Sequence, residues 1–168
     1  FVMRFYRLDS LPPGLFYDEA FNGLDAWQLA QTRMADWPVF LTGNQGREAL
    51  YVWLMALLHR VNGLSIWTIR AVPALCGALL TPALAWLGWE VAPWLGVKNR
   101  RAFALWSGAA VLALLWSQIF ARYGIRLSLF VLLETLLWAS LWRAWNSNAK
   151  AQRRKDAENL NAETQRRR

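Results

Sequence analysis

The sequence predicts an all-α fold, a polytopic bundle of membrane-spanning helices, on the strength of three observations. First, the 168 residues are 56% hydrophobic and only 18% charged, whereas about a quarter of the residues of a soluble domain are charged. Second, the charges gather in the N-terminal third, around residues 98–101 and after Trp145, with long apolar runs between them. Third, the chain has 12 tryptophans, several near the ends of those runs, where tryptophan favours the interface between water and lipid.

The segment of residues 15–62 predicts two surface helices and no span. Residues 19–34 are amphipathic. The apolar stretch of residues 49–61 would reach roughly 20 Å as a helix, short of a hydrocarbon core of about 30 Å. Residues 1–8 are too short and too basic for a signal peptide. They fit the outer end of a helix that begins upstream, and a start at Met3 is the alternative.

Three apolar runs predict membrane spans at residues 71–92, 102–121 and 127–145. The first would be about 33 Å long as a helix, which is enough to cross the hydrocarbon core. Pro82 lies in its middle and predicts a kink. The second run contains no charged residue. With the surface helices, these spans make residues 1–145 a membrane domain. Its expected partner is the lipid bilayer.

Basic residues set the expected orientation. The cluster at residues 98–101 lies between the first and second spans, so the positive-inside rule places it in the cytoplasm. The first span then runs inward, and the polar, basic tail of residues 146–168 is also cytoplasmic. Residues 9–70 and the turn at 122–126 face the other side of a multi-pass cell-membrane protein. The tail is nearly free of apolar residues, which predicts disorder or a solvated helix.

The net charge of +8 does not indicate a nucleic-acid partner. Most of the excess lies in loops and tail beside the apolar runs, where basic residues report topology. The single cysteine, Cys76, lies inside an apolar run, so no internal disulfide can form and the redox compartment stays undetermined.

Two acidic sites lie in the segment that precedes the first span. Asp18 and Glu19 follow a Pro-Pro-Gly turn at the predicted start of the first surface helix. Such acids cap a helix and complement its dipole, but a carboxylate there can also act as a general base. Glu48 precedes the second surface helix and has the same capping explanation, while its alternative role is to hold a metal or an acceptor.

Three arginines lie on the same predicted side of the membrane. Arg70 stands at the mouth of the first span, and Arg122 and Arg126 occupy the turn between the second and third spans. They could anchor the spans to headgroups or hold an anionic phosphate. Together with the acids, they would equip this side to move a group from a lipid phosphate to an acceptor.

Four short motifs, in order, resemble the C-fold glycosyltransferases of the family 39 type. These include protein O-mannosyltransferases and bacterial lipid A aminoarabinose transferases. The run RLDSLPPGLFYDEA at residues 7–20 is similar to the first external loop of that family. GREALY at 46–51, IRAVPAL at 69–75 and FARYGIR at 120–126 continue the resemblance. It covers roughly residues 5–145, and the order and spacing of the motifs are more specific than any one of them.

The resemblance implies an inverting transfer of a sugar from a polyprenyl-phosphate donor on the non-cytoplasmic face. By position, Asp18 matches the loop aspartate that serves as general base, and Glu19 completes the Asp-Glu pair. Glu48 matches the second loop acid, which helps to hold a divalent metal in some members. Arg70 matches an arginine close to the lipid phosphate. Arg122 and Arg126 would be kept outside to meet that phosphate.

The chain departs from the family in having fewer spans, so features that later helices contribute are missing and catalysis by this chain alone is in doubt. The sugar, the acceptor and any metal are not identified by the sequence. The alternative is a non-enzymatic polytopic protein, such as a transporter part or an assembly subunit, in which the acids cap helices and the arginines anchor to headgroups.

Overall fold

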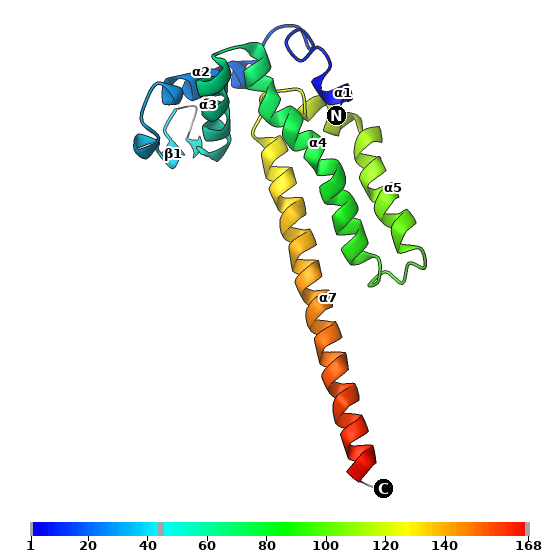
Figure 1. The fold of residues 1–168 in the computed structure, drawn as a ribbon. Coiled ribbons are helices and arrows are strands. Elements are labelled where there is room, and N and C mark those ends of the chain that lie inside the picture. The colour runs from blue at the N-terminus through cyan, green and yellow to red at the C-terminus, as the bar shows by residue number, and fades with distance from the viewer. Residues whose placement is uncertain (1, 44–45, 167–168) are drawn as a thin grey trace.

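The computed structural model describes residues 2–43 and 46–166 and is almost entirely helical. In Figure 1, the central helix α4 (Ile66–Val91) lies between α5 (Arg100–Ala113) and α7 (Leu127–Arg166), and it packs against both. Short elements from the first part of the chain gather at one end of these helices and form a cap over them. The other end of α7 extends alone beyond its neighbours.

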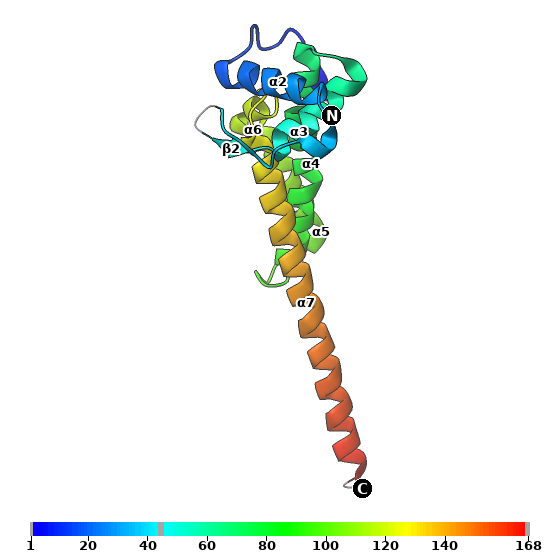
Figure 2. The same ribbon diagram turned by 90° about the vertical axis from the view of Figure 1, so that its left-hand side faces the viewer.

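The cap contains α1 (Val2–Phe5), α2 (Tyr17–Ala30), the 3-10 turn η1 (Met34–Asp36) and α3 (Leu50–Asn62). Helices α2 and α3 pack on each other, and Figure 2 shows them above the long helices. They occupy the two segments in which the sequence predicts surface helices.

A two-stranded antiparallel hairpin connects the two halves of the cap. Its strands β1 (Phe40–Leu41) and β2 (Arg47–Glu48) pair Phe40 with Glu48 and Leu41 with Arg47. The hairpin therefore ends directly before α3 and fixes the position of Glu48 on its edge.

Helix α4 begins earlier than the sequence predicts. Ser65 is its N-cap: the Ser65 hydroxyl accepts from the Thr68 N–H (3.1 Å), and the Thr68 hydroxyl accepts from the Ser65 N–H (3.0 Å). This reciprocal pair satisfies two N–H groups that a helix start leaves unpaired. The helix continues through both Pro73 and Pro82. Pro73, which would lie in the first turn of a helix that begins at residue 71, is consequently in the helix interior.

The second predicted span, residues 102–121, is not one helix. It is divided into α5 and the six-residue α6 (Leu115–Phe120) by Leu114, whose backbone is extended. Two polar side chains satisfy carbonyls that the break frees: the Ser117 hydroxyl donates to the Val111 carbonyl (2.6 Å) and the Gln118 amide to the Leu112 carbonyl (3.0 Å). A helix break in apolar surroundings needs such partners. The pair of polar residues in this apolar run was the available sequence signal.

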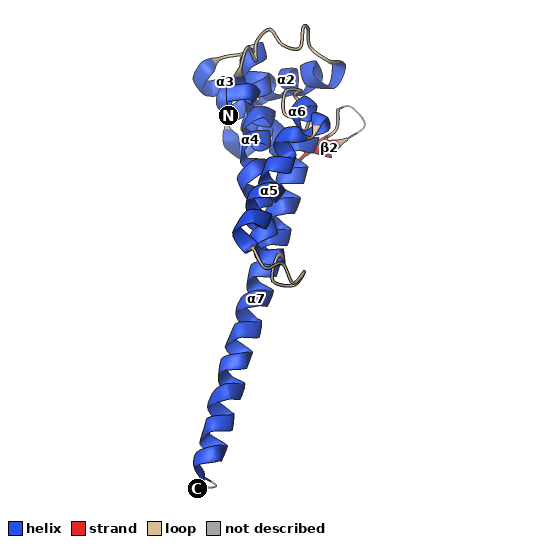
Figure 3. Ribbon diagram, turned by 90° about the vertical axis from the view of Figure 1, so that its right-hand side faces the viewer, coloured by secondary structure: helices blue, strands red, loops and turns tan. Residues whose placement is uncertain are grey.

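Helix α7 contains the third predicted span and most of the tail. The tail is helical as far as Arg166, where the sequence predicted disorder or a solvated helix. Residues 146–166 include no Gly or Pro and are rich in Ala, Gln, Glu, Lys and Arg, all of which have high helix propensity. Figure 3 shows this part of α7 projecting away from all other elements.

Within the described residues, two helices, α4 and α7, are long and apolar enough to cross a membrane, where the sequence predicts three spans. The apolar core that joins the cap to them is built from small and medium-sized side chains of α2, α3, α4 and α7. Its members are Ala26, Tyr51, Val52, Met55, Ala56, Ile69, Val72, Cys76, Ala83, Leu129 and Leu132. This core fixes the cap on the end of the long helices.

Candidate functional site

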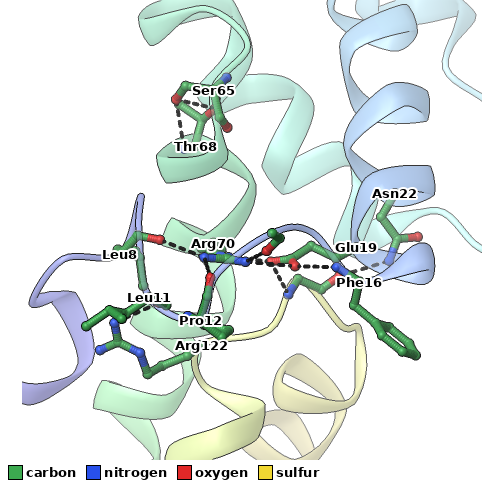
Figure 4. Close-up of polar contacts among 12 residues, drawn as sticks. Leu8, Leu11, Pro12, Phe16, Glu19, Asn22, Ser65, Thr68, Arg70 and Arg122 are labelled. Carbon is green, nitrogen blue, oxygen red and sulfur yellow. Dashed lines mark hydrogen bonds and ion pairs between the residues drawn. The ribbon is translucent and has the colours of Figure 1, made fainter.

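A fully buried ion pair joins the cap to α4. The Arg70 Nε lies 2.7 Å from Glu19 Oε1, and its Nη2 lies 3.2 Å from Glu19 Oε2. Both side chains have 0% of their surface exposed. Figure 4 shows the two side chains facing each other between α2 and α4. A pair held by two parallel N–H···O bonds has a defined geometry as well as a strong attraction.

Arg70 also organises the loop that precedes α2. Its Nη1 donates to the carbonyls of Leu8 (3.2 Å) and Pro12 (2.8 Å), and its Nη2 donates to the Gly14 carbonyl. With the two bonds to Glu19, all five N–H donors of the guanidinium are used. The expected contact of Arg70 with a lipid phosphate would require these bonds to open. In this conformation, Arg70 holds the loop.

Glu19 binds backbone N–H groups at the start of its own helix and in a turn that is distant in the sequence. Its Oε2 accepts from the Phe16 N–H (3.1 Å), which caps the start of α2, and its Oε1 accepts from the Gly124 N–H (3.1 Å). The Gly124 carbonyl in turn accepts from the Asn22 amide (3.0 Å). A Cβ on Gly124 would lie 2.7 Å from Glu19 Cγ and 3.0 Å from Ile69 Cγ2. Only glycine lets the turn at residues 121–126 approach Glu19 so closely.

Arg122 brings the same turn against the N-terminal loop. Its Nη2 donates to the carbonyls of Tyr6 (2.6 Å), Leu11 (2.9 Å) and, at 3.4 Å, Arg7. Burial lowers the pKa of Arg122 from its ordinary value, and the positive charge of Arg70 lowers it further. The two arginines thus bind different carbonyls of the same N-terminal loop.

Glu48 and Arg126 form a second pair of very different character. The Arg126 Nη1 lies 3.6 Å from Glu48 Oε2, with 47% of the Arg126 side chain and 69% of the Glu48 side chain exposed. Arg126 follows Gly124 by two residues, so the exposed pair and the buried pair share one turn. This second pair is open to a ligand from outside.

Asp18 lies in the first turn of α2, next to Glu19, and is partly buried. The structure thus places five of the six predicted residues around the turn at residues 121–126: Glu19, Glu48, Arg70, Arg122 and Arg126. Asp18 is adjacent to this cluster through the backbone of α2. Residues that are dispersed over the sequence therefore lie together at one end of α4 and α7.

Sequence reasoning missed Arg4, which supports the turn from the other side. Its Nη1 donates to the Ser117 carbonyl (2.9 Å) and its Nη2 binds the Ser117 hydroxyl (3.0 Å). A Cβ on Gly77 would overlap both Arg4 and Ala121. An arginine among the apolar residues at the start of the chain was the available sequence signal.

A second missed interaction lies in the cap. Arg47 pairs with Asp25, and its guanidinium lies over the Phe21 ring at 4.8 Å from the centroid. Burial raises the pKa of Asp25, and the positive charge of Arg47 opposes that effect. This pair fixes the hairpin on α2, so that Glu48 is held beside Arg126.

The described residues show no preformed cluster of ligands for a divalent metal. None of them forms a group of three His, Cys, Asp or Glu side chains that could hold an ion. The candidate ligand Glu48 pairs with an arginine instead. We therefore derive no chemical step through a metal.

No protein-family model matches the chain, and no curated protein or solved structure matches it either.

Proposed function

We propose that this chain is a membrane glycosyltransferase module that transfers a sugar from a polyprenyl-phosphate donor to an acceptor on the non-cytoplasmic face. One observation carries the proposal. The four segments that resemble the family 39-type enzymes, separated by up to a hundred residues, contact one another at one end of two helices that are long enough to cross a bilayer.

In the proposed reaction, Asp18 acts as general base. It takes the proton from an acceptor hydroxyl while that oxygen attacks the anomeric carbon of the sugar. The bond between that carbon and the phosphate oxygen breaks, and polyprenyl phosphate leaves with the electron pair. Inversion follows because the acceptor attacks the face opposite the leaving group. A positioned base of this kind contributes about 10²- to 10⁴-fold to the rate.

The remaining residues divide into two roles. Glu19 and Arg70 are positioning residues, because their polar atoms bind the loop and the turn that flank Asp18. Arg126 offers a partly exposed guanidinium to the leaving phosphate, and Glu48 orients it. Arg122 draws the turn against the loop and adds positive charge beside it, which favours an anionic group.

The alternative is the non-enzymatic membrane protein. It is favoured by the saturation of Arg70, whose five donors all bind within the chain. In that case the buried pair of Glu19 and Arg70 only attaches the cap to α4. Asp18 is then only a helix-capping acid.

The substitution Asp18→Asn in the full chain separates these functions. Membranes carrying the chain are given a radiolabelled polyprenyl-phosphate sugar, and both transfer of the label and donor binding are measured. We expect Asp18→Asn to lower transfer at least about 100-fold, since the general base is lost, with unchanged donor binding and thermal unfolding. Asp9→Asn changes an exposed acid of the loop that precedes α2; it is the matched control and should leave transfer intact. Unchanged transfer in Asp18→Asn would remove Asp18 from the reaction. Absence of both donor binding and transfer in the parent chain would favour the non-enzymatic alternative.

A further inference from the structure

Two adjoining pockets lie at the end of α4 that is far from the cap. The first, of about 400 Å³, is formed by the segment after α4, the start of α5 and one face of α7. Its polar lining includes Arg100, Lys150 and Arg153. The two α7 cations are three residues apart, so they project from the same side of the helix. This pocket is positively charged.

The second pocket, of about 280 Å³, is apolar. It is lined only by Trp94, Trp138, Leu141, Trp142 and Trp145. Trp94 and Trp142 hold its two sides together, with ring centroids 5.6 Å apart. Trp94 and Trp145 also line the basic pocket. The two pockets therefore make one continuous site with a cationic half and an aromatic half.

Glu90, which is bonded to two of the residues that line the basic pocket, is already engaged. Glu90 accepts from Arg100 (3.4 Å) and from the Asn146 amide (3.1 Å). Arg100 is itself held by the Trp89 carbonyl (2.5 Å), with its guanidinium 4.0 Å from the centre of the Trp89 ring. Lys150 and Arg153 are exposed. The pocket lining thus includes a fixed arginine and two further cations and no carboxylate, while Asp156, one turn further along α7, accepts from the Gln152 amide (3.0 Å).

The site lies at the level where the apolar surface of the long helices ends. Helix α4 ends at Val91, and the apolar part of α7 ends near Trp145. Tryptophans concentrate at that level of a membrane protein, and basic pockets between helices there bind anionic headgroups. In an anionic phospholipid, a negatively charged phosphate is joined to apolar chains. The phosphate complements the cationic half of the site, and the chains complement its aromatic half.

We propose that this site binds an anionic phospholipid, with the phosphate against Arg100, Lys150 and Arg153 and the first part of an acyl chain among the tryptophans. The proposal does not depend on the proposed sugar transfer. It depends only on α4 and α7 lying in a bilayer.

The test uses the full chain in detergent, titrated with dioleoylphosphatidylglycerol or dioleoylphosphatidylcholine, with bound lipid counted by native mass spectrometry. We expect tighter binding of phosphatidylglycerol, and a loss of affinity of about tenfold or more in the double variant Lys150→Gln/Arg153→Gln, because each cation near an anionic lipid surface contributes severalfold. The matched control Lys155→Gln/Arg166→Gln removes the same charge from α7 outside the pocket, and should lower the affinity less than twofold.

A third arm distinguishes a lipid from a free phosphate. Trp145→Ala changes an exposed side chain of the aromatic half, so it should weaken phosphatidylglycerol binding severalfold without altering the helical fold. Glycerol 3-phosphate alone should bind far more weakly than the lipid. Equal binding of glycerol 3-phosphate would identify a simple phosphate site. Equal losses in the two double variants would show diffuse attraction to α7, and either result would overturn the proposal.

Discussion

The two glutamate–arginine pairs of the candidate site differ in almost every physical respect although they share one turn. Glu19 and Arg70 are fully buried, with a shortest N–O distance of 2.7 Å. Glu48 and Arg126 are 3.6 Å apart and largely exposed. In the buried pair, backbone groups from the N-terminal loop, α2 and the turn satisfy the polar atoms that remain.

This difference shows that Glu19 stabilises the fold and that Glu48 is available to a ligand. Burying a charge is expensive, and it is tolerated when the geometry is good and every remaining polar atom has a partner. Glu19 and Arg70 meet that condition, so their bonds are committed to holding the loop, α2 and the turn together. An exposed pair gains little from its attraction. The ion pair of Glu48 and Arg126 can therefore open to bind a ligand at a small cost in free energy.

The largest expected effect is that of Glu19→Gln. This substitution keeps the shape of the side chain but leaves the buried charge of Arg70 without its partner, and such a loss costs about 3–5 kcal/mol. We expect a correspondingly lower free energy of unfolding in detergent, measured by circular dichroism during denaturant titration. A loss below about 1 kcal/mol would contradict the view that the buried charge of Arg70 depends on Glu19 for its stabilisation.

Helix positions, and the residue types that gather at the site, could largely be predicted from the sequence. Apolar length indicates α4 and the first part of α7, and the Pro-Pro-Gly turn before Asp18 and Glu19 indicates the start of α2. The position of Ser65 three residues before Thr68 would also have given the true start of α4. These are local signals, which act over one turn of helix.

The division of roles between the two pairs could not be predicted in this way. Nothing in the sequence distinguishes Glu19, which ends up with no exposed surface, from Glu48, since both precede or begin a predicted surface helix. Glu19 is buried against Arg70 and against Gly124, which lies about a hundred residues further along the chain. The helix break at Leu114 also depends on Ser117 and Gln118 reaching back to free carbonyls.

A smaller loss is expected from Gly124→Ala. The added Cβ would lie 2.7 Å from Glu19 Cγ and 3.0 Å from Ile69 Cγ2, so the turn or the glutamate must move. Overpacking of this kind costs about 1–3 kcal/mol. The same denaturant titration measures this loss. The double variant with Glu19→Gln should lose less free energy of unfolding than the sum of the two single losses, because both substitutions act on one contact. Additive losses would show that the turn is held independently of Glu19.

The smallest expected effect on stability is that of Glu48→Gln, which is also the matched control for Glu19→Gln because the chemical change is identical. The carboxylate of Glu48 lies in water, and the median exposed ion pair contributes no more than about 1 kcal/mol. We therefore expect a change in the free energy of unfolding below about 0.5 kcal/mol. The affinity for a polyprenyl-phosphate donor should nevertheless rise, because the substitution releases Arg126 toward the phosphate. A loss of stability as large as that of Glu19→Gln would mean that the two pairs hold the cap together equally, and that burial does not separate their roles.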